Sequence, residues 1–149
     1  MADAFDRYVP EMIETRRRIH KRPELGWTEF ETTAIVAKKL TELGFEIHLG
    51  REVVNPDAVL GRDPKAVEAA ITRAREAGVP EELLSRMDGY TGCVGILDTG
   101  RPGPTLAFRH DMDALPIQEL QDPAVHLPAK EGFASTFKGV MHACGHDAH

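Results

Sequence analysis

The order of apolar patterns along the chain limits its possible folds more than any other feature of the sequence. Apolar side chains recur at helical spacing in two stretches near the start, residues 3–21 and 28–43. Short apolar runs bounded by turn residues follow them and are typical of strands, at residues 45–49, 93–97 and 105–108. Helices interspersed with short strands predict an α/β fold with a mixed sheet.

Turn and cap residues refine these boundaries. Thr28 and Glu31 have the spacing of a capping box, so we expect Thr28 to start the second helix. Gly44 is placed to end that helix. A turn rich in glycine and proline at residues 100–104 separates the last two apolar runs, which predicts that these runs pair as a hairpin or as neighbouring strands.

The middle of the chain differs in character from its two ends. Residues 65–77 and 80–87 predict two short, highly charged helices. We interpret the region at about residues 50–90 as a charged helical insertion on the surface of the main fold. The whole chain, at 149 residues, has room for one domain.

Charge and apolar content exclude several classes of protein. Lys and Arg number 18 against 24 Asp and Glu, a net charge of −6, so nucleic acid is not an expected partner. There is no run of about 18 apolar residues to cross a membrane and no apolar segment near the start to direct export. We therefore expect a cytoplasmic protein with no membrane partner, in which Cys93 and Cys144 are free thiols or metal ligands.

The strongest chemical signal lies in the last eight residues. Five of the eight side chains in His142–His149 are possible metal ligands. Cys144 and His146 are two residues apart and would point to one side of an extended segment, and a thiolate with an imidazole suits zinc or another divalent first-row ion. Gly145 allows a tight bend between them. Asp147 is a further candidate, either as a ligand or as the group that orients a ligating imidazole.

Two other interpretations of this cluster stay open. In one, Cys144 is a small buried apolar residue, and the histidines, including His142, are hydrogen-bonded loop residues. In the other, Cys144 is a catalytic nucleophile, although the local signatures of cysteine proteases are absent. The density of ligand-type side chains favours a metal site over both.

A second group of charged residues directly follows an apolar run, which is where open α/β sheets place ligand-binding residues. Within Arg109–Pro116, Asp111 and Asp113 are two residues apart, and two close carboxylates repel unless a cation lies near them. A metal ion or a metal-bound imidazole would remove that repulsion. The competing interpretation is a strand end with solvated acids. A third stretch, His20–Trp27, is interpreted equally well as a helix end followed by a turn.

Three segments together resemble the M20 metallopeptidase superfamily, and most closely its amidohydrolase branch: Arg17–Glu29, Asp111–Pro116 and Met141–His149. They occur in the order of the family's motifs. Two further segments, Gly50–Asn55 and Asp98–Pro104, resemble the branch members that hydrolyse aminobenzoyl-glutamate. The resemblance extends over essentially the whole chain but matches only the first part of the family's length.

The resemblance implies roles for individual residues. Cys144 and His146 correspond to metal ligands, and Asp113 corresponds to the catalytic-site acid, which would orient a ligand imidazole and strengthen it as a base. Asp111 stands where sister branches have a metal-binding histidine, and Cys144 would compensate as a ligand. His110 precedes the motif at a position where no ligand is expected.

The resemblance also implies a fold and a reaction. The fold is a zinc-peptidase-like α/β/α catalytic domain with a mixed central sheet, of which residues 1–149 would be an incomplete N-terminal part. The reaction is hydrolysis of the amide bond of an N-acyl or N-aroyl amino acid, with aminobenzoyl-glutamate from folate catabolism as the expected substrate. Two divalent metal ions, Mn²⁺ or Zn²⁺, would activate the attacking water.

The resemblance implies that some of the machinery lies outside these residues. The family's general base, its remaining metal ligands and its lid or dimerisation domain would follow the last residue of the chain. We therefore expect the chain to be inactive alone. The complete protein would form a homo-oligomer or pair with a homologous B subunit.

Two alternative functions stay open. An aminoacylase or N-acetyl-amino-acid deacetylase of the same branch would share these motifs. A non-catalytic metal-binding or partner subunit would share the metal ligands, but a purely structural metal site does not need Asp111 and Asp113.

Overall fold

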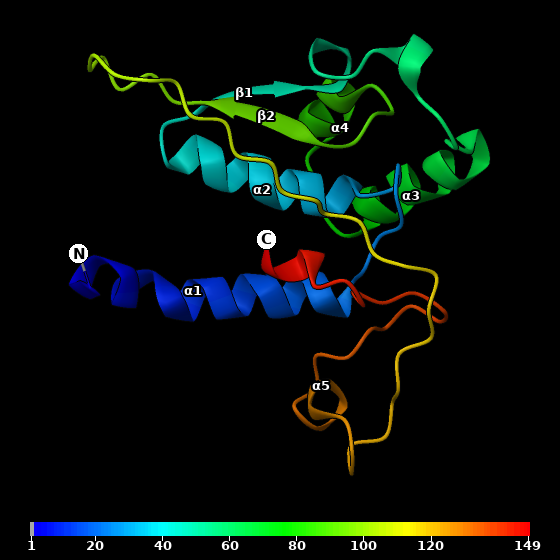
Figure 1. The fold of residues 1–149 in the computed structure, drawn as a ribbon. Coiled ribbons are helices and arrows are strands. Elements are labelled where there is room, and N and C mark those ends of the chain that lie inside the picture. The colour runs from blue at the N-terminus through cyan, green and yellow to red at the C-terminus, as the bar shows by residue number, and fades with distance from the viewer. Residues whose placement is uncertain (1) are drawn as a thin grey trace. The chain divides into compact units, whose positions relative to one another are not determined.

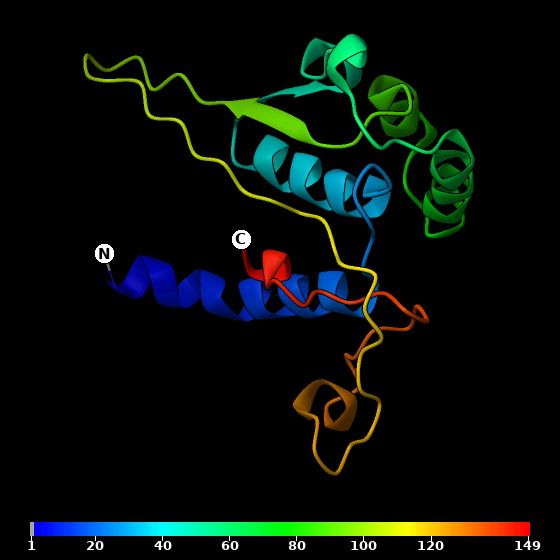
Figure 2. The ribbon, with the colours of Figure 1, turned by 45° about the vertical axis from the view of Figure 1, so that its right-hand side comes forward.

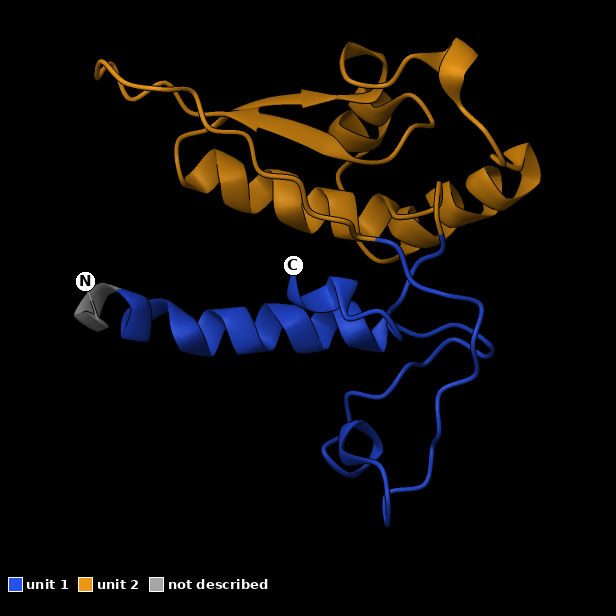
Figure 3. Ribbon diagram, in the orientation of Figure 1, with its two compact units in different colours: residues 1–25, 113–149 blue, residues 26–112 orange. Residues whose placement is uncertain are grey.

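The computed structural model describes residues 2–149, with side chains from residue 5 onward. The described chain divides into two compact units, which are coloured separately in Figure 3. Unit 1 combines the chain up to Leu25 with Asp113–His149, and unit 2 consists of Gly26–Met112. Each unit is built by a different kind of interaction.

Unit 2 contains a small sheet, three helices and two single 3₁₀ turns (Figure 1). The elements in chain order are α2 (Phe30–Glu42), β1 (Glu46–Leu49), η1 (Gly50–Glu52), η2 (Pro56–Ala58), α3 (Pro64–Glu76), α4 (Glu81–Met87) and β2 (Cys93–Ile96). Strands β1 and β2 pair antiparallel, with Glu46 opposite Ile96 and Leu49 opposite Cys93. Helix α2 contacts both strands and α3, so it forms the centre of the unit.

An apolar core holds unit 2 together. Its fully buried members come from α2, β1, α3 and α4: Phe30, Ala34, Ala37, Leu49, Val67, Ala70, Ala74, Leu84 and Met87. Burial of a large apolar side chain such as Phe30 contributes about 1.5–3 kcal/mol. The two helices expected within residues 50–90 therefore form, and their apolar sides are part of this core.

Unit 1 contains the long helix α1 (Ala2–Lys21), the short helix α5 (Leu127–Lys130) and the single 3₁₀ turn η3 (His146–Ala148). Figures 1 and 2 both show η3 lying along α1, and the two elements are in contact. Two isolated bridges, Leu25 with Ala114 and Leu115 with Met141, tie the remaining chain together. Many of its buried side chains are polar or charged: His20, Glu24, Glu119, Ser135, His142 and Asp147.

The expected elements agree with the structure in type and closely in extent. The helix predicted at residues 3–21 is α1, and it continues through Pro10 rather than starting there. The strands predicted at residues 45–49 and 93–97 are β1 and β2. The α/β class is confirmed, and among the described residues the regular sheet consists of these two strands.

Two local expectations are wrong. Thr28 does not cap α2, because the helix starts at Phe30 with Glu29 as its N-cap residue and no side chain caps its first turn. Residues 105–108 form no strand, and their side chains are exposed. Since β2 pairs with β1, no partner strand is available to residues 105–108 within the described chain, and a lone extended segment has little stability of its own.

None of the helices among residues 2–149 is both long enough and apolar enough to cross a membrane.

The close approach of η1 to α4 yields a test of the core of unit 2. Gly50 has a positive φ of +58°, and a Cβ atom there would lie 2.5 Å from the carbonyl oxygen of Arg86 and 2.7 Å from that of Met87. Replacement of Gly50 by Ala would therefore force two backbone segments apart. We expect the Gly50→Ala variant to lose about 2–4 kcal/mol of unfolding free energy in urea denaturation.

Gly61 supplies the matched control. Its φ is +70°, but a Cβ atom there would meet no atom within 4 Å. Gly61→Ala should therefore lose only the cost of the left-handed backbone, about 1 kcal/mol. Equal losses in the two variants would contradict the packing of η1 against α4.

Candidate functional site

The ligand-type residues at the end of the chain lie on a turn, not on an extended segment. Gly145 has a φ of +81°, which is strained for a residue with a Cβ atom, and η3 begins at the next residue. The bend expected at Gly145 is present, but the extended geometry expected for Cys144 and His146 is not. The Cys144 thiol is exposed and the His146 ring is half-buried.

Asp113 fixes the ring of His146. The Nδ1 atom of His146 lies 3.0 Å from Asp113 Oδ1 and 2.9 Å from the Asp113 carbonyl oxygen. A carbonyl oxygen only accepts hydrogen bonds, so Nδ1 carries the hydrogen and donates it. In the neutral ring Nε2 then has a free lone pair, and it makes no hydrogen bond within the described part of the chain. This is the state in which histidine binds a metal ion.

Asp111 and His110 do not join this arrangement. Asp111 Oδ1 accepts a hydrogen bond of 2.6 Å from Nη2 of Arg109, so a neighbouring cation already neutralises its charge. His110 is exposed. Of the two acids in the Asp-x-Asp motif, the structure therefore brings Asp113 to the turn of His146.

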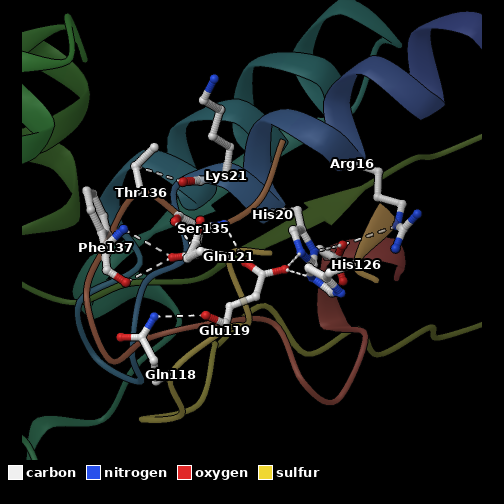
Figure 4. A network of polar contacts seen from close by, with 11 residues as sticks. Arg16, His20, Lys21, Gln118, Glu119, Gln121, His126, Ser135, Thr136 and Phe137 are labelled. Atoms are coloured by element: carbon white, nitrogen blue, oxygen red, sulfur yellow. Dashed lines mark hydrogen bonds and ion pairs between the residues drawn. The ribbon is translucent and has the colours of Figure 1, made fainter. Parts of the chain in front are cut away.

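Beside the turn lies a buried network of charged groups (Figure 4). His20, on the last turn of α1, is held between two carboxylates. Its Nδ1 atom lies 2.9 Å from Asp147 Oδ2, and its Nε2 atom lies 2.9 Å from Glu119 Oε1. The side chains of Glu119 and Asp147 are 0% and 1% exposed.

This geometry determines the charge of His20. An ionised carboxylate can only accept, so both ring nitrogens of His20 must donate, and only the imidazolium ion has two N–H groups. The hydrogen bond to Asp147 raises the pKa of His20 above its ordinary value, burial opposes that rise, and Glu119 adds to it. His20 is therefore a buried cation.

Both carboxylates receive further hydrogen bonds. Nε of Arg16 lies 3.1 Å from Asp147 Oδ2. Glu119 accepts a hydrogen bond of 2.8 Å from Nε2 of His126 and another from the backbone N–H of Ser135. Burial alone would raise the pKa of Asp147 and Glu119, but these donors hold the pKa of each carboxyl below its usual range. Both acids are therefore ionised.

His142 lies beside this network without joining it. It is 4% exposed, and neither ring nitrogen has a hydrogen-bond partner among the described residues. Burial lowers the pKa of His142, and the nearby His20 cation lowers it further. His142 is therefore a neutral ring whose centroid lies 6.3 Å from that of His20.

Sequence pattern alone does not single out several residues of this network. Pattern places Arg16 on a solvated helix face, and Glu119, His126 and Ser135 lie in a loop with weak patterning. A basic residue at the spacing i, i+4 from His20 is the one local signal, because such residues share a helix face.

The described residues contain no group of three or more histidine, cysteine or acidic side chains arranged around a common point. Cys144 and His146 therefore stand as two donors on one turn. Their chemistry, a thiol and an imidazole with Nε2 available, fits a divalent first-row metal.

The charge of His20 predicts how stability depends on pH. Because its pKa is raised in the folded state, its contribution is complete below about pH 6.5 and is lost as pH rises through the folded pKa. Asp147 and Glu119 have lowered pKa values, so their contributions are complete above about pH 4.5 and are lost as pH falls. The unfolding free energy should therefore fall between about pH 6 and pH 9 in the wild-type chain.

His20→Gln should remove most of that fall and lower the unfolding free energy near pH 6 by about 3 kcal/mol, since it leaves a buried acid underpaired. His110→Gln replaces an exposed histidine and should change neither value. Urea denaturation at several pH values measures both. An unchanged pH dependence in His20→Gln would contradict the imidazolium assignment.

Comparison with known proteins places the chain among hydrolases. No protein-family model matches it. It is 51% identical over 143 residues to the indole-3-acetyl-aspartic acid hydrolase of Enterobacter agglomerans, covering 95% of this chain and 33% of that protein. It is 46% identical over 140 residues to a Haemophilus influenzae homologue of the first of the two p-aminobenzoyl-glutamate hydrolase chains, covering 93% and 33%. The chain thus spans about a third of the length of these curated relatives.

Two solved structures have the same fold. The aminobenzoyl-glutamate utilization protein of Klebsiella pneumoniae is 46% identical with a TM-score of 0.73, covering 76% of this chain and 30% of that one. A Bacillus subtilis protein described as a dinuclear metal-binding peptidase is 31% identical with a TM-score of 0.57, covering 95% and 28%. That protein is assigned to the M20 family. Sequence identity over nearly its whole length and a shared fold therefore show that the chain belongs to the M20 peptidase family.

Proposed function

We propose that this chain contributes to a metal-dependent hydrolase that cleaves the amide bond of an N-acyl or N-aroyl amino acid. The observation that carries the proposal is the pairing of Asp113 with Nδ1 of His146, because it leaves Nε2 as a lone-pair donor two residues from the Cys144 thiol. A metal ligand oriented by a carboxylate in this way is typical of catalytic zinc and related sites.

The names of the relatives support a narrower substrate class. Indole-3-acetyl-aspartate and p-aminobenzoyl-glutamate both join an aromatic acyl group to an acidic amino acid. We propose substrates of this class, with aminobenzoyl-glutamate as the first to test. The relative with the higher identity is named for indole-3-acetyl-aspartate, which makes that compound the second candidate.

Each residue of the turn has a proposed role. Cys144 and His146 would hold a divalent metal, Mn²⁺ or Zn²⁺, as part of a two-metal site. A bound metal of this kind lowers the pKa of its water to about 7 and polarises the amide carbonyl. Asp113 keeps the hydrogen of His146 on Nδ1 and the ring in one orientation. Asp147 holds the turn through its buried carboxylate.

We propose that residues 1–149 are part of a larger catalytic domain with a charged helical insertion at about residues 50–90. A dinuclear site needs more ligands than the two on this turn, together with a general base. We propose that these groups lie outside the chain, which would then be inactive alone. The complete enzyme would be cytoplasmic and would form a homo-oligomer or pair with a homologous B subunit.

Cobalt provides a spectroscopic test of the proposed ligands. Co²⁺ bound to a thiolate has a strong charge-transfer absorption band, so the wild-type chain titrated with Co²⁺ should develop this band. Cys144→Ser should abolish it, because the exposed Cys144 supplies the sulfur ligand.

Cys93→Ser is the matched control. Cys93 is half-buried in β2, and burial raises the pKa of its thiol, which disfavours the thiolate. The band should persist in this variant. A band that survives Cys144→Ser, or no band in the wild-type chain, would contradict the ligand assignment.

A further inference from the structure

We infer that Arg16 and His20 of α1 are positioning residues for the metal-binding turn, acting through the buried carboxylate of Asp147. The inference rests on the proposed function, because it concerns the same pair of ligands, Cys144 and His146. It adds a part of the molecule far from these ligands in sequence, at the other end of the chain.

The contacts of Asp147 carry the argument. Asp147 is the middle residue of η3, directly after His146, and its side chain is 1% exposed. A single oxygen, Oδ2, lies 3.1 Å from Nε of Arg16 and 2.9 Å from Nδ1 of His20. Arg16 and His20 are four residues apart on α1 and therefore share one helix face. That face of α1 binds the turn at its centre.

The helix face is itself held from a second direction. His20 donates its other N–H to Glu119, which is fully buried and also accepts hydrogen bonds from His126 and the Ser135 backbone. The ring of His20 further packs edge-on against Phe133, with centroids 5.5 Å apart. His20 therefore cannot rotate without breaking contacts on both sides, so the oxygen of Asp147 has a fixed partner.

Two independent restraints then determine where the His146 ring lies. Arg16 and His20 fix the backbone of the turn through Asp147, and Asp113 fixes the rotation of the ring through Nδ1. A ligand held in its binding geometry before the metal arrives loses less conformational freedom on binding. Loss of an outer group that orients a metal ligand lowers metal affinity by about 10–100-fold.

A purely structural role predicts something different. If Arg16 only stabilised the fold, its removal would lower the unfolding free energy but leave the Co²⁺ affinity of the folded chain unchanged. Arg16 is the better residue to vary first, because its side chain is 49% exposed and its replacement endangers the fold less than that of His20.

The test measures Co²⁺ affinity by titration of the thiolate charge-transfer band in the 149-residue chain, at a temperature where circular dichroism shows each variant folded. Arg16→Gln should bind Co²⁺ about 10-fold more weakly than wild type, and Arg16→Lys, which keeps a cationic donor, should recover part of the loss. Arg17→Gln is the matched control, since Arg17 pairs with Glu131 and lies over Phe133 instead of contacting Asp147. Its affinity should equal that of wild type.

A second readout needs no metal. The N–H of Ala148 donates to the Gly145 carbonyl oxygen at 2.9 Å and reports on closure of the turn. Its hydrogen exchange should become about 10-fold faster in Arg16→Gln and His20→Gln, but not in His126→Gln, which touches Glu119 and not Asp147. An amide in the core of unit 2 serves as the reference.

The outcomes separate this inference from the proposed function. Equal Co²⁺ affinity and equal Ala148 exchange in Arg16→Gln and wild type would overturn the positioning role while leaving the ligands in place. A wild-type chain that shows no Co²⁺ band would overturn the proposed ligands and, with them, the inference. Weaker binding in Arg16→Gln and Arg17→Gln alike would also overturn it, because the effect would not depend on Asp147.

Discussion

The charged ring of His20 lies between two buried carboxylates, and the arrangement of unit 1 depends on this contact. A charge removed from water is costly unless it is paired and its hydrogen bonds are satisfied. Here one cation satisfies Asp147 and Glu119 together, and Arg16, His126 and Ser135 complete the set. The contact joins α1 to segments about 100 and 127 residues away in the chain.

The two units show two different ways to stabilise a fold. Unit 2 buries Phe30, Leu49 and Met87 in an apolar core, which tolerates changes in pH because it contains no titrating group. Unit 1 relies on groups whose charges depend on pH and whose directions are specific. A directional network is suited to hold a functional turn, because each hydrogen bond fixes an orientation as well as a distance.

The sequence predicts the parts of the structure that arise from local pattern. The helices α1 to α4 and the strands β1 and β2 follow from apolar periodicity and turn residues, which act over a few neighbours. The strand expected at residues 105–108 fails because a strand needs a partner, and periodicity does not report one. Short motifs are enough to single out Asp113, Cys144 and His146. They do not reveal Glu119 and Arg16, since the roles of these two exist only when distant segments meet.

The central claim is that His20 carries a positive charge above the pH at which a free histidine loses its proton, about 6.5. Nitrogen-15 nuclear magnetic resonance of the His20 ring at about pH 7.5 tests it most directly, because protonated and unprotonated ring nitrogens have well-separated chemical shifts. The structure predicts that both nitrogens have the shift of protonated nitrogen. One protonated and one unprotonated nitrogen would contradict the account.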